Sequence, residues 1–294
     1  PTMYICPSIL LGQDARVVRP GRRPEAAGRR AEMEISRQDV DGGRPFDWGR
    51  TSSDYAKYRD VYPPEFYRRI IDRKLCVRGQ TILDVGTGTG VLPRNLYPYG
   101  AKWVGADLSE RQIEQARRLS AGLDIEYYAL PAEKLDFPAG AFDVITACQC
   151  HWYFDHERVC GKFFDMLKPD GRLLFLYMAW LPFEDDIAAA GEALVLKYNP
   201  NWSGKGETMH PIEIPACYRE CFDVVCREEY PLRVHFTRES WNGRLKACRG
   251  VGASLSEAEI AGWEREHIRL LEQIAPPEFD VRHYGAMAEL KKRG

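Results

Sequence analysis

The chain has 294 residues, of which 45% are hydrophobic and 29% are charged, a composition typical of a globular protein that fills its own core. Its formal net charge of −2 excludes a broad positive field for nucleic acid, and no apolar run reaches the roughly 20 residues that a membrane span needs. The cysteine count of nine is odd, and most of these residues stand in apolar segments, which favours reduced thiols in the cytoplasm.

Residues 1–43 are predicted to form a disordered extension, and residues 44–294 a single folded domain. The first 32 residues carry six arginines together with several glycines and prolines, and they show no sustained apolar periodicity. An arginine-rich start is also typical of an organelle transit peptide, but the acidic residues Asp14, Glu25 and Glu32 argue against that alternative.

The folded part opens with alternating strands and helices. A helix is predicted from Pro63 to Leu75, a strand over 81–85, a glycine loop over 86–90 and a helix from Val91. The alternation continues with strands over 102–106, 124–129, 142–147 and 172–177, and with helices over 109–119 and 156–167. Strands that alternate with helices predict an α/β fold with a parallel sheet.

The regular alternation of strands and helices ends in the second half of the chain. Helical cap insertions are predicted around 183–222 and 237–275, on either side of an extended segment over 226–236. A closing strand is predicted over 279–288.

The glycine loop over 86–90 allows a ligand to approach the backbone closely, but it does not fit the common phosphate-binding patterns. The sixth position counted from Gly86 is Val91, whereas a dinucleotide fingerprint requires Gly or Ala there. The Gly-Lys pair of a phosphate-cradling loop is also missing from this segment. A redox enzyme that uses a dinucleotide is therefore disfavoured.

The sequence DVGTGTG from Asp84 to Gly90 instead resembles the first motif of the class I S-adenosylmethionine-dependent methyltransferases. Four further segments resemble that family in the expected order, and together the resemblance covers about residues 51–177. It implies a Rossmann-like methyltransferase fold, with a mostly parallel seven-stranded sheet, an antiparallel last strand and helices on both faces. It also implies S-adenosylmethionine as cofactor and S-adenosylhomocysteine as product.

The resemblance assigns cofactor-binding roles to residues after the first three strands. Asp84 matches the acid that stabilises the ammonium of the cofactor, and Asp107 matches the acid that accepts hydrogen bonds from the ribose hydroxyls, with Leu108 beside the adenine. Ala132 and Glu133 match the loop that frames the adenine edge, although Pro131 stands where many relatives have an acid. The loop itself contributes Gly86, Thr87, Gly88 and Gly90.

The substrate side is predicted where the fourth strand ends. The segment from Gln149 to Tyr153 is similar to a type-11 branch related to trans-aconitate methyltransferase, whose members modify small, often carboxylate-bearing molecules. Gln149 is assigned to the cofactor, Trp152 and Tyr153 to the substrate wall, and His151 to proton acceptance. The alternative is that His151 and the aromatic side chains only pack in the core.

An entry segment, Trp48 to Arg59, precedes the first helix, and with Tyr62 it resembles the Y-x-x-Y-R-x-x-Y-P pattern of the same branch. Tyr55 and Arg59 are assigned to the cofactor, and Tyr58 is the second predicted catalytic residue. The segment is expected either to close over the cofactor as a lid or to be a packed amphipathic helix.

The cap segment carries a basic cluster from which Arg244 is predicted to bind a substrate carboxylate. The other members of the cluster are Arg233, Arg238, Lys246 and Arg249. Charge clusters are also typical of solvated surfaces. No metal site is expected, because the cysteines lack paired metal-ligand spacing.

The sequence therefore predicts methyl transfer to a small molecule, by a monomer or homodimer without nucleic acid or membrane partners. Methylation of RNA or protein and a cofactor-binding module without activity are the alternatives.

Overall fold

The computed structural model describes residues 35–38 and 40–294, and its centre is a seven-stranded sheet. The strands are β1 (Thr81–Val85), β2 (Lys102–Asp107), β3 (Ile125–Ala129), β4 (Phe142–Cys148), β5 (Leu167–Trp180), β6 (Phe222–Thr237) and β7 (Glu278–Lys292). Their order is β3-β2-β1-β4-β5-β7-β6. The strands β1 to β5 pair in parallel, and β7 runs antiparallel to both of its neighbours. The predicted sheet and its antiparallel last strand are confirmed.

Helices cover both faces of the sheet, as predicted. One face carries α2 (Pro64–Asp72), α3 (Val91–Leu96) and α4 (Glu110–Leu119), and the other carries α5 (His156–Met166) and α7 (Ala216–Cys221). Apolar side chains alternate along the strands, so that Ile82 packs on the first face and Leu83 on the second. The two cores that result fix the direction in which each polar side chain at a strand end points.

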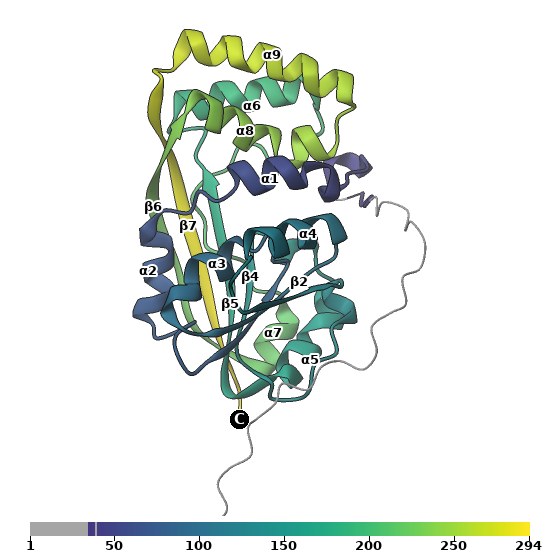
Figure 1. The fold of residues 1–294 in the computed structure, drawn as a ribbon, viewed down its shortest axis with the longest axis vertical. Helices are drawn as coiled ribbons and strands as arrows, with labels where there is room; N and C mark the ends of the chain where they lie inside the picture. Colours follow the sequence, from purple (N-terminus) through teal and green to yellow (C-terminus); the bar gives the residue numbers. More distant parts are fainter. Residues whose placement is uncertain (1–34, 39) are drawn as a thin grey trace, which may run out of the picture.

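A helical cap lies beyond the carboxyl ends of the parallel strands (Figure 1). It consists of α6 (Asp186–Tyr198), α8 (Arg238–Lys246), a short helical segment η6 (Arg249–Ala253) and α9 (Glu257–Ile274). Figure 1 shows α1 (Ser52–Tyr58) between this cap and α4. The long strands β6 and β7 run past the rest of the sheet and hold the cap in place (Figure 1).

The cap differs from the prediction in one element. The predicted insertion over 183–222 includes α7, but α7 packs beside α5 on the face of the sheet (Figure 1). Its Tyr218 is fully buried in the core that this face forms with β5. The sequence alone did not show whether this helix would cover the sheet or the cap.

The predicted extension over 1–43 lies mostly outside the described residues. Residues 40–43 differ from that prediction, because Val40 and Asp41 are buried and Asp41–Gly43 forms a 3-10 turn, η1. A second 3-10 turn, η2 (Trp48–Thr51), leads into α1. The structure has three further 3-10 turns. They are η3 (Tyr97–Tyr99) after α3, η4 (Ala132–Lys134) after β3 and η5 (His151–Tyr153) after β4.

Candidate functional site

Asp84 stands near the carboxyl end of β1, beside β4, where the strand order of the sheet reverses. Only 1% of its surface is exposed, and the Thr146 hydroxyl of β4 donates a hydrogen bond of 2.7 Å to its Oδ1 atom. Burial raises the pKa of the Asp84 carboxyl to about 6, although the bond from Thr146 opposes the rise. A buried carboxylate of this kind is stabilised when a cation binds beside it.

Asp107 ends the neighbouring strand β2, as the sequence predicted. Its Oδ2 atom accepts a hydrogen bond of 2.9 Å from the Gly88 backbone N–H, and its Oδ1 atom accepts one of 2.9 Å from the Ser109 N–H. Burial raises the pKa of Asp107, and the charge of Asp107 raises the pKa of Asp84. The two acids therefore belong to one electrostatic site, and the glycine loop links them.

The glycine loop turns sharply between β1 and α3. Gly86 and Gly90 have φ angles of 69° and 74°, which favour glycine, and Thr87 donates its N–H to the Ala106 carbonyl of β2. A Cβ at Gly86 would collide with the Cys150 sulfur, and one at Gly90 would collide with the Tyr127 hydroxyl. The loop is thus fixed against both neighbouring segments, with Gly88 at its centre.

Replacing Gly90 with alanine is expected to lower the free energy of unfolding by about 3 kcal/mol, because the left-handed φ and the collision with Tyr127 both oppose a side chain. Gly79→Ala is the matched control. Gly79 also has a positive φ, but nothing lies within 4 Å of its added Cβ, so about 1 kcal/mol is expected. Urea denaturation of both variants measures the difference. Equal losses in the free energy of unfolding would show that the Tyr127 side chain moves aside.

The entry segment covers the glycine loop in this structure. A Cβ on Gly88 would lie 3.6 Å from the Tyr55 ring, and the Gln112 side chain of α4 donates a hydrogen bond of 3.1 Å to the Trp48 carbonyl. The Arg59 guanidinium stacks 4.7 Å from the centroid of the Tyr55 ring and donates a bond of 3.2 Å to its hydroxyl. Tyr55 and Arg59 thus reach the predicted cofactor region.

Tyr58, a predicted catalytic residue, lies elsewhere. Its hydroxyl donates a hydrogen bond of 3.0 Å to Glu239 at the protein surface, and its ring lies against Gly243 of α8. The residue therefore joins α1 to the cap and turns away from Asp84. Tyr58 directly precedes Arg59, so the two side chains point about 100° apart around the helix axis, and that of Tyr58 meets α8.

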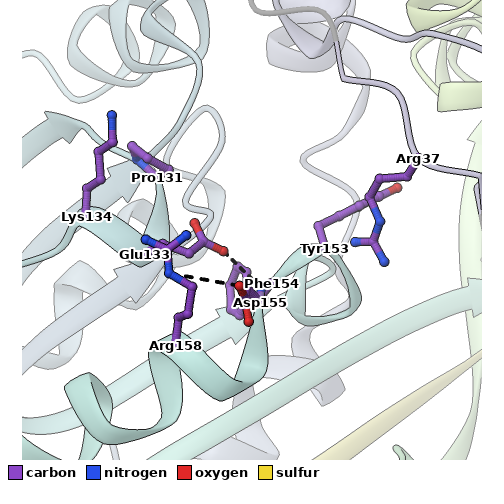
Figure 2. Close-up of a pocket in the computed structure, with 8 residues that line it drawn as sticks. All are labelled: Arg37, Pro131, Glu133, Lys134, Tyr153, Phe154, Asp155 and Arg158. Carbon is purple, nitrogen blue, oxygen red and sulfur yellow. Dashed lines mark hydrogen bonds and ion pairs between the residues drawn. The ribbon is translucent and has the colours of Figure 1, made fainter.

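An open pocket of about 490 Å³ lies beside the predicted adenine loop. Glu133 lines it and accepts a hydrogen bond of 3.0 Å from the Asp155 N–H (Figure 2). Ala132 is buried and does not line this pocket. Figure 2 shows Tyr153 and Arg37 across the pocket from Glu133. Leu108 is half-buried next to Asp107 and does not line this pocket.

The aromatic residues after β4 form a wall with the entry segment. Trp152 packs edge-on against Tyr177 of β5, with 5.2 Å between ring centroids, and Tyr153 packs against Trp48 at 6.2 Å and Phe46 at 6.0 Å. These contacts join Trp152 to the sheet and Tyr153 to the entry segment, and their role in a substrate wall stays a prediction.

His151 and Gln149 are held by β5. The His151 ring packs 5.0 Å from Phe175, and burial lowers its pKa to about 3. An imidazole with so low a pKa is a weak base at neutral pH, so the packing alternative fits His151 better than proton acceptance. Gln149 has a φ of 63° and donates its side-chain amide to the Met178 carbonyl.

The structure separates the predicted basic cluster into different environments. Arg238 donates to the Ala275 carbonyl, Lys246 pairs with Glu264, and Arg233 is exposed. Arg244 is different. It is 3% exposed, and its Nε and Nη1 atoms are buried without a hydrogen-bond partner among the described residues.

Arg244 faces the site from α8. Its guanidinium lies 4.9 Å from the centroid of the Trp180 ring, where β5 ends. Burial lowers the pKa of Arg244 to about 9, and the charge of Arg59 lowers it further. Two arginines thus share this region, which favours the binding of an anion.

An ion pair between Asp41 and Arg249 was missed by the sequence analysis. Asp41 Oδ2 accepts a bond of 2.8 Å from Arg249 Nε, and Oδ1 accepts one of 3.0 Å from Nη2. Arg249 also donates to the Tyr153 hydroxyl, and the Ser203 N–H donates to Asp41 at 2.7 Å. The ion pair therefore connects η1, the cap and the aromatic wall.

Within residues 35–38 and 40–294, no group of three or more His, Cys, Asp or Glu side chains is arranged to hold a metal ion. The helices of the same residues include none with the length and apolar character that crossing a membrane requires.

Comparison with known proteins covers the part of the site from Asp84 to Tyr153. A family model described as a methyltransferase domain matches residues 82–171, which run from β1 into β5. Ubiquinone biosynthesis O-methyltransferase of Pseudomonas entomophila (strain L48) is 28% identical over 199 residues, which cover 64% of this chain and 84% of that protein. Demethylmenaquinone methyltransferase of Thermus thermophilus is 38% identical over 114 residues, which cover 37% of this chain and 52% of that protein.

Among solved structures, the YcgJ protein of Bacillus subtilis is similar, with a TM-score of 0.44 and 18% identity over 78% of this chain and 99% of that protein. The fold assignment rests on the strand order of this chain.

Proposed function

We propose that the chain is a class I S-adenosylmethionine-dependent methyltransferase, and that it methylates a small molecule that carries an anionic group such as a carboxylate. The two relatives named above modify biosynthetic precursors of quinones by their printed names, which supports a small acceptor. The single observation behind the anionic group is the buried Arg244 guanidinium. The resemblance to the trans-aconitate methyltransferase branch stays a prediction.

The residues around the glycine loop suit the cofactor. S-adenosylmethionine supplies a methyl group on a positively charged sulfur when it is bound. Asp84 would hold the ammonium of its methionine portion, because burial has already raised the pKa of this carboxyl and a cation would stabilise the charged form. Asp107 would accept hydrogen bonds from the ribose hydroxyls, since each carboxylate oxygen has a second lone pair beside its bond to the backbone.

The remaining residues position the acceptor and exclude water. The transfer is an in-line displacement, so the protein mainly aligns the two reactants in a dry site. Tyr55 covers the loop from the entry segment, and the Trp48 ring packs edge-on against Tyr55 at 6.3 Å. Arg244 would hold the anionic group from the cap. A carboxylate oxygen needs no proton removed, which agrees with the weak basicity of His151.

Replacing Arg244 with methionine is expected to raise the KM for anionic acceptors about 100-fold and to leave the affinity for S-adenosylmethionine unchanged. The apo-protein should become more stable, because a buried guanidinium with unpaired donors is costly. The assay is the formation of S-adenosylhomocysteine with pools of small carboxylates, phenols and amines, followed by mass spectrometry of the methylated product.

Arg238→Met is the matched control on the same helix, because Arg238 bonds to the Ala275 carbonyl rather than to the site. It should leave the KM of every acceptor unchanged. A product from neutral acceptors alone would overturn the anionic proposal. Cofactor binding without any product from these pools, or from RNA and protein substrates, would favour the binding module without activity.

A further inference from the structure

Three cysteines meet between α5 and α7, on the face of the sheet opposite α3. The Cys160 sulfur of α5 lies 3.5 Å from the Cys221 sulfur of α7, although the two residues are 61 positions apart in the chain. Cys217 lies one helical turn before Cys221, and its thiol points to the His156 carbonyl at 3.7 Å. Cys160 is 5% exposed, whereas Cys217 and Cys221 are partly exposed.

We propose that Cys160 and Cys221 form a reversible disulfide when the protein meets a hydroperoxide. A disulfide needs its sulfur atoms about 2 Å apart, so the two sulfurs must approach each other by about 1.5 Å. The surrounding contacts already hold the two helices together. The His156 ring of α5 and the Tyr218 hydroxyl of α7 form a hydrogen bond of 3.0 Å, and both rings pack against Phe175 of β5.

Other cysteines in the described part of the chain have partners that are not sulfur. Cys148 donates to the Tyr62 hydroxyl, Cys150 donates to the Val85 carbonyl, and Cys226 contacts the Arg73 guanidinium. None of these three thiols contacts a second thiol, so none of them is placed to form a disulfide. The pair between α5 and α7 differs in this respect.

The chemistry begins at the more exposed thiol. The Cys221 thiolate attacks one oxygen of hydrogen peroxide, the O–O bond breaks, and hydroxide leaves as water after protonation, which gives a sulfenic acid. The Cys160 thiolate then attacks the Cys221 sulfur, the S–S bond forms, and a second water leaves. In total, two thiols lose two hydrogen atoms and one peroxide becomes two waters. Burial raises the pKa of the Cys160 thiol, which disfavours direct attack of Cys160 on the peroxide.

The cross-link would tie together helices that lie beneath the aromatic wall. Helix α5 follows η5 in the chain, and Phe175 contacts both His151 and Tyr218. Because the bond closes a long loop of chain, we expect the oxidised protein to melt several degrees higher than the reduced protein.

Peptide mapping tests the proposal without an activity assay. The intact protein is treated with equimolar hydrogen peroxide, blocked with an alkylating reagent and digested with trypsin under non-reducing conditions. Cleavage after Arg and Lys places Cys160 in peptide 159–162, Cys217 in peptide 206–219, and Cys221 with Cys226 in peptide 220–227. The variant Cys226→Ser removes the ambiguity in the last of these peptides and leaves the proposed pair intact.

The expected product is peptide 159–162 joined to peptide 220–227, in the original protein and in Cys226→Ser, with release by a dithiol reductant. Cys221→Ser and Cys160→Ser should each lose this product and the rise in melting temperature, while their reduced forms melt close to the original protein. Recovery of Cys160 and Cys221 as alkylated thiols or as sulfinic acids would overturn the proposal, and so would a cross-link of Cys160 to peptide 206–219.

Discussion

Asp84→Asn is expected to weaken the binding of S-adenosylmethionine roughly 100-fold, about 3 kcal/mol, while making the apo-protein more stable. Affinity falls because the asparagine side chain has no charge to pair with the cofactor ammonium. Stability rises because the original carboxylate is ionised in a buried site at neutral pH. Titration calorimetry with S-adenosylmethionine and urea denaturation of the apo-protein measure the two effects.

The pKa of Asp84 sets the size and the pH dependence of the stability change. Burial raises this pKa from the ordinary 3.8 to about 6, so the folded protein binds the proton more tightly than the unfolded chain does. Stability from this group is therefore fully present below pH 4 and is lost as the pH rises to about 6, by about 3 kcal/mol in total. Asp84→Asn should remove this loss, so the two proteins should differ in stability at pH 7.5 and not at pH 4.

Cofactor affinity should follow the opposite course with pH. Asp84 must lose its proton before it pairs with the ammonium, so the affinity of the original protein should fall by up to tenfold per pH unit below about pH 6. Asp143→Asn is the matched control, because Asp143 lies on β4 near the opposite end of the sheet and pairs with Lys168. Affinity within threefold of the original in Asp84→Asn would place the ammonium elsewhere.

The cofactor half of this site was predictable because its signals are local in the sequence. A strand with an acid next to its last residue, followed by a glycine loop and a helix, places Asp84 at the carboxyl end of β1 within one short stretch of chain. Asp107 likewise stands at the end of the next strand, and parallel strands bring their carboxyl ends to one edge. The register between β1 and β2 then determines the distance between the two acids.

The substrate half was less predictable because it depends on contacts between distant segments. Arg244 and Arg249 are similar in sequence context, but packing leaves one with unpaired donors and gives the other a carboxylate 208 residues away. Tyr58 and Tyr55 share one short helix, yet one faces the surface and the other faces the glycine loop. Which way each side chain points is fixed by the packing of α1 against the cap.

Asp41→Asn is expected to lower the free energy of unfolding by about 3 kcal/mol, because it leaves the partly buried Arg249 guanidinium without its counter-charge. Asparagine keeps the size of the side chain and tolerates the φ of 51° at this position, so the change isolates the charge. Urea denaturation at constant pH measures the loss. Glu239→Gln is the control, because it breaks an ion pair with Lys57 that is exposed on both sides, and its midpoint should stay at the original value.

The double variant Asp41→Asn, Arg249→Met tests whether the effect comes from the pair. Removing both charges leaves neither one buried alone, so the double variant should be more stable than either single variant. A strictly additive loss would instead assign the effect to the separate contacts of Asp41 with Ser203 and of Arg249 with Tyr153. If Asp41→Asn unfolds within about 0.5 kcal/mol of the original protein, the charge of Asp41 contributes nothing to the stability of the folded domain. A large loss in the free energy of unfolding would show that the ion pair of Asp41 with Arg249 holds the cap against the aromatic wall.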